Sequence, residues 1–156
     1  MSDILINKAR ACAVTGHRAL KEDFDREKLK NLFLRAIDYG YDIFLVGMAI
    51  GFDMLCFSVL EEIRKKKNIA IIACVPCRNQ SERYPFIKKL EYKRMLKSAD
   101  YVNVLSEEYT SRCMQDRNEY MVDNASLLIA HLYQERGGTF NTVRYAKKKG
   151  IKIAYI

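Results

Sequence analysis

The sequence has no apolar run long enough to span a bilayer. Its longest apolar runs cover residues 69–75 and 127–130, whereas a membrane helix needs about 20 consecutive apolar residues. Residues 1–10 also lack the apolar stretch of a secretion signal. We therefore expect a soluble, cytoplasmic protein with no membrane partner.

Low-complexity linkers and internal repeats, which would indicate several domains or a repeat array, are also missing. The chain has 156 residues, of which 49% are hydrophobic and 29% are charged. This length is typical of one domain with a buried core, and this composition is far from that of disordered chains. We expect one folded domain over residues 1–156.

Nothing in the sequence completes a metal site or a hydrolase motif. Cys74 and Cys77 form a C-x-x-C pair, but no second such pair and no histidine pair accompanies it. Neither His17 nor His131 lies in a serine or cysteine hydrolase motif, and we expect His131 to be structural. The five cysteines lie mostly in apolar segments, which favours buried free thiols over a redox pair. We predict neither a metal nor a cofactor.

The formal net charge is +8, which suits an anionic partner such as nucleotide phosphate or nucleic acid. Two lysine runs, 65–67 and 147–149, contribute much of this charge at the ends of predicted helices. Cations at these positions are solvated and complement the negative end of the helix dipole. We favour that interpretation, so the charge alone does not establish a nucleic-acid partner.

Short apolar runs alternate with segments of helical periodicity along the chain. Strands are predicted over residues 11–15, 42–46, 69–75, 101–105, 127–130 and 152–155. Helical segments include 29–37, which Gly40 is placed to end, 55–63, and a last helix that Thr139 caps and Gly150 ends. Apolar strands that alternate with amphipathic helices indicate a parallel sheet covered on both faces. We predict an α/β fold, a single doubly wound Rossmann-like domain with a mainly parallel sheet of about six strands flanked by helices.

Ligands of such sheets bind at the carboxyl ends of the strands, so the residues after each strand are candidates for a site. Gly16, His17 and Arg18 follow the first strand. Glycine lets backbone amides approach an anion, and the arginine guanidinium offers a fork of donors to phosphate or carboxylate. A tight turn with a solvated arginine explains the same residues equally well.

The second strand ends in a turn with paired glycines, Gly47 and Gly51, which enclose Met48 and Ala49. Such a turn exposes amides at the positive end of a helix, where phosphate binds. Asp53, near the start of that helix, either caps it or binds a ribose hydroxyl. The G-x-x-x-G spacing is not the dinucleotide-binding fingerprint.

A third glycine turn, Gly137 and Gly138, precedes Thr139 and Thr142 in the last predicted helix. Its free amides and hydroxyls suit an anionic ligand, and an N-cap with a glycine hinge is the structural alternative.

The segment 113–123 is predicted to be a helix on which Met114, Arg117, Asn118 and Met121 share a face. A buried arginine is costly without an anion. This favours a ligand role for Arg117, with a structural salt bridge as the alternative.

As an ordered set, the segments 15–18, 47–53, 117–123 and 137–142 resemble the YpsA-like branch of the SLOG superfamily, over nearly the whole chain. The resemblance implies a Rossmann-like fold and a nucleotide or nucleotide-derived ligand. LOG enzymes of this superfamily split the base from a nucleoside monophosphate with an arginine and a glutamate. Arg117 and Asn118 are similar to their arginine–lysine pair, but no acid follows Thr142, which leaves Asp53 or Glu119 as the substitute carboxylate.

The leading prediction is a domain that binds a nucleotide-derived small molecule at the carboxyl edge of the sheet and senses or sequesters it. The predicted ligand-binding residues are Gly16, His17, Arg18, Gly47, Met48, Ala49, Gly51, Asp53, Arg117, Asn118, Gly137, Gly138, Thr139 and Thr142.

Two alternatives stay open. The first is a LOG-like nucleotide N-glycosidase in which Arg117, Asp53 and Glu119 are catalytic. The second is binding of single-stranded nucleic acid, although no element shows aromatic residues interleaved with basic ones. The sequence does not distinguish a monomer from a homo-oligomer.

Overall fold

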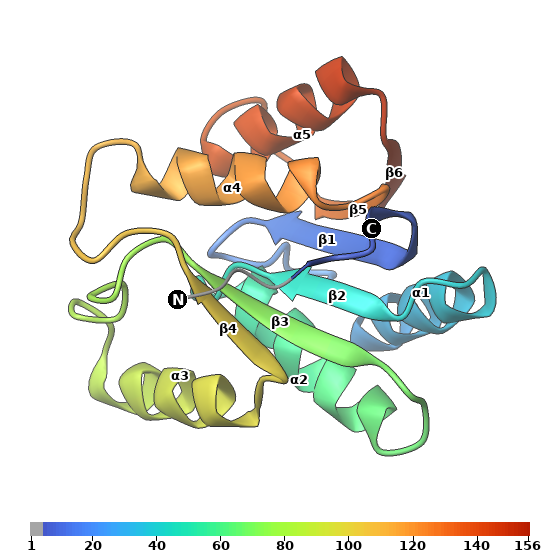
Figure 1. Cartoon of the computed structure of the whole chain (residues 1–156), viewed down its shortest axis with the longest axis horizontal. Coiled ribbons are helices and arrows are strands. Elements are labelled where there is room, and N and C mark those ends of the chain that lie inside the picture. The colour runs from blue at the N-terminus through green and yellow to red at the C-terminus, as the bar shows by residue number, and fades with distance from the viewer. Residues whose placement is uncertain (1–4) are drawn as a thin grey trace.

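The computed structural model describes residues 5–156, and its centre is a six-stranded sheet (Figure 1). The strands are β1 (Ala11–Gly16), β2 (Ile43–Val46), β3 (Ala70–Val75), β4 (Tyr101–Val104), β5 (Leu127–His131) and β6 (Lys152–Tyr155). Their order is β4-β3-β2-β1-β5-β6, and every neighbouring pair is parallel. This confirms the predicted parallel α/β sheet.

The sheet is doubly wound, because the chain builds β1 to β4 outward in one direction and then returns to the other side of β1 for β5 and β6. The helices are α1 (Arg26–Asp38), α2 (Phe52–Arg64), α3 (Phe86–Ser98), α4 (Cys113–Asp123) and α5 (Gly138–Lys149), with a short 3-10 helix at Lys8–Arg10. Figure 1 shows α1, α2 and α3 on one face of the sheet and α4 and α5 on the other. Because all neighbouring strands are parallel, their carboxyl ends all lie at one edge of the sheet.

Alternate residues of each strand enter two separate cores. Val14, Phe44 and Ile71 face the larger core under α1, α2 and α3, which also contains Phe33 and Phe57. The opposite face packs smaller residues of the strands against α4 and α5. Burial of both faces explains why the strands have nearly continuous apolar sequences.

The ends of all six predicted strands lie within one residue of the observed ones. One expectation about a helix end was wrong. Thr139 does not cap the last helix, because α5 begins at Gly138 with Gly137 as its N-cap, and Thr139 lies inside the first turn. Gly137 has φ +91, a conformation that residues with a side chain rarely adopt.

The five cysteines, Cys12, Cys56, Cys74, Cys77 and Cys113, are buried and form no disulfide. The lysine runs at 65–67 and 147–149 are exposed, as the solvated-end interpretation requires. Within residues 5–156, no helix combines the length and apolar character needed to cross a bilayer.

Candidate functional site

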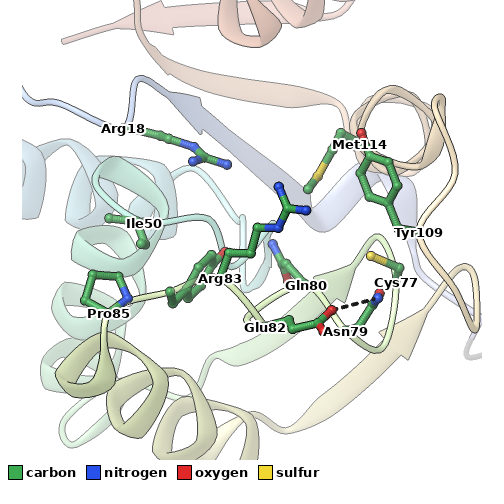
Figure 2. A pocket seen from close by; sticks show the side chains of 11 residues that line it. Arg18, Ile50, Cys77, Asn79, Gln80, Glu82, Arg83, Pro85, Tyr109 and Met114 are labelled. Carbon is green, nitrogen blue, oxygen red and sulfur yellow. Dashed lines mark hydrogen bonds between the residues drawn. The ribbon is translucent and has the colours of Figure 1, made fainter.

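A cavity of about 610 Å³ opens at the carboxyl edge of the sheet (Figure 2). Its walls come from the loops that follow β1, β2, β3 and β4 and from the first turn of α4. It is lined by Arg18, Ile50, Cys77, Asn79, Gln80, Glu82, Arg83, Tyr84, Pro85, Tyr109 and Met114. We call it the arginine cavity, because two of these residues are arginines from different loops.

Arg18 and Arg83 direct their guanidinium groups into the space between the loops (Figure 2). Within the part of the chain that the structure describes, neither side chain makes a hydrogen bond or a salt bridge. Tyr109, which is 63% exposed, and Met114 form a third wall. The cavity thus combines two unpaired cations with an aromatic ring and a thioether.

The floor of the cavity is held by two buried side chains of the β3–α3 loop. Gln80 donates from Nε2 to the Gly47 carbonyl oxygen at 3.0 Å, and its Oε1 accepts from Tyr92 at 2.9 Å. Tyr84 donates its hydroxyl to the Met48 carbonyl oxygen at 3.1 Å. Burial raises the pKa of Tyr84 to about 12, against the opposing charge of the nearby Arg18. Tyr84 therefore stays a hydrogen-bond donor at neutral pH.

Arg117 lies under this floor and is only 5% exposed. Its Nη1 donates to the carbonyl oxygen of Gly47, and at 3.4 Å to that of Cys74, while Nε donates to Asn118 Oδ1 at 2.8 Å. A Cβ on Gly47 would lie 2.7 Å from Nη1. The donors of the buried guanidinium are thus satisfied by carbonyl and amide oxygens of the protein, and the carboxylate of Asp53 is the opposite charge near it.

Asp53 is buried beside Arg117 at the start of α2. Its Oδ2 accepts from the Ala49 amide at 3.2 Å, so the carboxylate closes the β2–α2 turn on itself. Burial raises the pKa of Asp53 to about 6, and the charge of Arg117 and the Ala49 amide oppose that shift. Asp53 is not among the residues that line the arginine cavity.

The β1–α1 loop packs closely over the start of α2. A Cβ on Gly16 would lie 2.3 Å from the Phe52 ring, and one on Gly51 would lie 2.1 Å from the carbonyl oxygen of Arg18. The Phe52 amide already donates to the His17 carbonyl oxygen at 3.2 Å. The amino end of α2 is therefore covered by protein backbone.

The two histidines join the β1–α1 loop to the end of β5. His17 Nε2 accepts from the Tyr133 amide at 3.2 Å, and His131 Nε2 accepts from the Lys21 amide at 3.2 Å. His131 Nδ1 contacts the Ile156 carbonyl oxygen at 3.0 Å. Burial, and to a lesser degree His131, lower the pKa of His17, which favours the neutral ring. These contacts support the structural role expected for His131.

The third glycine turn has a different environment. A Cβ on Gly137 would meet nothing within 4 Å, and one on Gly138 would meet only Asn118 Nδ2 at 3.9 Å. Thr139 and Thr142 are buried, and Thr142 donates its hydroxyl to the Gly138 carbonyl oxygen at 2.7 Å. Asn118 therefore lies between Arg117 and this open turn.

Glu119 is not brought to this group of residues. Its carboxylate accepts from Gln115 at 2.9 Å and pairs with Arg112 at 3.3 Å, both along α4. Of the two carboxylates considered as substitutes for the LOG glutamate, only Asp53 lies beside Arg117.

Of the predicted ligand-binding residues, only Arg18 lines the arginine cavity. Gly47, Met48, Ala49, Asp53 and Arg117 form the layer beneath it, and the α5 turn is separate from its lining. The β3–α3 loop was not predicted to be part of the site, because its polar residues form no recognisable motif. In the structure this loop contributes an exposed arginine, Arg83, followed by a buried tyrosine, Tyr84.

A doubly wound parallel sheet with a ligand-sized cavity at its carboxyl edge defines a Rossmann-like α/β domain. Within that class, the chain belongs to the YpsA family: the family model described as "YspA SLOG family" matches residues 12–155. The SPbeta prophage-derived protein YoqJ of Bacillus subtilis (strain 168), described as uncharacterized, is 32% identical over 118 residues, which are 67% of this chain and 69% of that protein. These matches confirm the resemblance inferred from the four motifs.

Two solved structures share the fold. DNA processing protein A (DprA) of Streptococcus pneumoniae matches with a TM-score of 0.68 at 19% identity, over 95% of this chain and 50% of its own. DprA of Helicobacter pylori, described as having a unique single-stranded DNA binding mode, matches with a TM-score of 0.66 at 15% identity, over 96% of this chain and 66% of its own. This chain therefore spans only part of either DprA chain.

Proposed function

We propose that this protein binds a nucleotide in the arginine cavity, with the phosphate on Arg18 and Arg83 and the base against Tyr109 and Met114. The observation that carries the proposal is that Arg18 and Arg83, both exposed, line one cavity and have no side-chain partner within residues 5–156. Arginine offers forked donors that match phosphate, and an exposed aromatic ring offers a stacking surface. A volume of about 610 Å³ lies within the usual range for small-ligand pockets.

In this proposal Arg117 is a positioning residue. It holds the Gly47 carbonyl oxygen, the same atom that Gln80 binds from the cavity floor. Arg117 thereby fixes the β2–α2 turn, to which the floor residues Gln80 and Tyr84 are hydrogen-bonded. The ligand contacts come from the loops that line the cavity. Membership of the SLOG family supports a nucleotide-derived ligand in general.

The test is titration calorimetry with AMP, GMP, CMP and UMP. Arg83→Ala and Arg18→Ala should each weaken binding at least about tenfold, because each removes a charge-assisted contact to phosphate. Both side chains are exposed, so neither change should lower the melting temperature appreciably. Arg35→Ala is the matched control, because Arg35 is an exposed arginine on α1, away from the cavity. Parent-like affinity in both cavity variants would rule the cavity out.

Single-stranded DNA is the second candidate, and exposed aromatic residues favour it. Tyr109 lines the cavity, and Phe86, which is 72% exposed, directly follows the lining residue Pro85. Aromatic rings beside cations are the usual platform for single strands. If a strand is the ligand, a 12-nucleotide oligothymidylate binds more tightly than dTMP, and its affinity falls steeply with salt. Equal affinity for the oligonucleotide and for dTMP would indicate that the ligand is a single nucleotide.

The glycosidase alternative is decided in the same samples. Incubation of AMP with the protein, followed by chromatography, shows whether free adenine appears faster than in buffer. Binding without release supports a binding domain. If the protein released adenine and Asp53→Asn abolished that release, catalysis would instead be assigned to this chain.

A further inference from the structure

The lining of the arginine cavity contains one carboxylate, that of Glu82 in the β3–α3 loop. Glu82 is exposed, and its Oε2 accepts a hydrogen bond from Asn79 Nδ2 at 3.3 Å, which Figure 2 shows as a dashed line. Within residues 5–156, no lysine or arginine forms a salt bridge with it. Glu82 therefore keeps its negative charge uncompensated and its Oε1 free to accept hydrogen bonds.

The other polar groups of this loop differ in how much of their hydrogen-bonding capacity is already used. Both ends of the Gln80 amide and the hydroxyl of Tyr84 are bound to protein groups of the cavity floor. Asn79 uses one hydrogen of Nδ2 on Glu82. The loop thus presents to a ligand mainly the acceptor oxygens of Glu82 and Asn79, beside the donors of Arg83.

The charges of the cavity are of opposite sign and are not paired with each other. Glu82 and Arg83 are neighbours in the sequence and both line the cavity, but no salt bridge joins them in residues 5–156. A phosphate is attracted to Arg18 and Arg83 and repelled by Glu82, whereas the N–H donors of a base are attracted to Glu82. These charges favour a nucleotide whose base, and not its phosphate, contacts Glu82.

We propose that Glu82 selects guanine by accepting hydrogen bonds from the N1–H and the N2 amino group of the base. This inference rests on the proposed nucleotide function. A carboxylate offers acceptors only, and guanine places two donors side by side on its pairing edge. Adenine and cytosine place a ring acceptor beside their amino group, and uracil has a carbonyl oxygen on each side of its N–H. Those acceptors face the carboxylate and weaken binding.

GMP should therefore bind at least about tenfold more tightly than AMP, because hydrogen bonds to a charged acceptor are stronger than neutral ones. AMP still binds through its phosphate and its contact with Tyr109. IMP lacks the N2 amino group of GMP but keeps N1–H, so the comparison of GMP with IMP isolates one hydrogen bond. We expect GMP to bind about fivefold or more tightly than IMP.

The test is titration calorimetry of the full chain and of Glu82→Gln with GMP, IMP and AMP. Glutamine keeps one acceptor but places an NH₂ group against the amino group of guanine. The ratio of the GMP and IMP affinities should therefore fall to about one in the variant, while AMP binding is not weakened. Retained AMP binding also shows that the variant is folded. A parent-like preference for GMP in Glu82→Gln would overturn the assignment.

Glu108→Gln is the matched control, because Glu108 is an exposed carboxylate next to Tyr109 that does not line the cavity. It should keep the GMP-to-IMP ratio of the parent, and an equal fall of that ratio in both variants would overturn a contact between Glu82 and the base. Equal affinities of the parent for GMP, IMP and AMP, lost in Arg83→Ala, would overturn guanine selection and leave the proposed function standing. Absence of binding of all three nucleotides would overturn both.

Discussion

The turn before α2 and the turn before α5 are alike in sequence, since each places two glycines near the start of a helix, but they differ in their surroundings. At Gly51 an added Cβ would lie 2.1 Å from the carbonyl oxygen of Arg18. At Gly138 the nearest atom would be Asn118 Nδ2 at 3.9 Å. The first turn is filled by protein, and the second faces open space.

The backbone amides of the two turns differ in the same way. In the first turn, Ala49 donates to Asp53 and Phe52 donates to the carbonyl oxygen of His17. In the second, Gly137 provides no side-chain cap, and the first amides of any helix lack intrahelical partners. A missing side chain can thus make room for the protein itself or for a ligand, and only the fold distinguishes the two cases.

The largest expected effect comes from Gly51→Ala. The new methyl would overlap the Arg18 backbone, and Gly51 has φ +94, which strains any residue with a Cβ. We expect the free energy of unfolding, measured by urea denaturation, to fall by about 4 kcal/mol.

Gly40→Ala is the matched control for that change. Gly40 also has a positive φ, +107, but an added Cβ would meet nothing within 4 Å. It should cost only about 1–2 kcal/mol from backbone strain. Equal losses in the two variants would show that the first turn is not closed by packing.

The next effect is a pH dependence from Asp53, which holds the first turn closed. Its pKa is about 6 in the folded state against 3.8 for the unperturbed group, so the folded state binds the proton more tightly. The contribution of this group to stability is full below about pH 4 and is lost as the pH rises through 6. The shift corresponds to about 3 kcal/mol.

Asp53→Asn removes this titration. The free energy of unfolding of the parent, relative to the variant, should therefore fall between pH 4 and pH 7. Measurement is by urea denaturation at several pH values, with Asp38→Asn, an exposed carboxylate on α1, as control. A parallel pH profile for parent and Asp53→Asn would contradict the assigned pKa.

The strands and α4 could be predicted from the sequence because their signals are local. Buried strands have nearly continuous apolar residues, and α4 has the predicted bounds, Cys113–Asp123. No bounds were predicted for α3, since it buries Tyr92 and Met95 on one side while Phe86, Ile87 and Leu90 are exposed. Its apolar residues therefore do not form one stripe.

The site was harder to predict, because its geometry depends on contacts between distant loops. The carboxyl edge and Arg18 follow from the topology of a parallel sheet. The contribution of Arg83 and Tyr84 does not follow from the topology, because a polar loop without a motif gives no indication of which other loop it will face in the fold. The buried oxygens that satisfy Arg117 are backbone carbonyls of residues 47 and 74, which no side-chain pattern reveals.

The smallest stability effect, and the sharpest test of the open turn, is Gly138→Ala. The methyl has room, and alanine is favoured over glycine in a helix, so the free energy of unfolding should stay level or rise by up to about 1 kcal/mol. Thermal denaturation checks this, and a clear loss of stability would mean that the turn is packed after all. Calorimetry with AMP on the same variant then tests the predicted ligand role of the turn. Because folding is intact, weaker binding would place the ligand against the α5 turn, and unchanged binding would confine it to the arginine cavity.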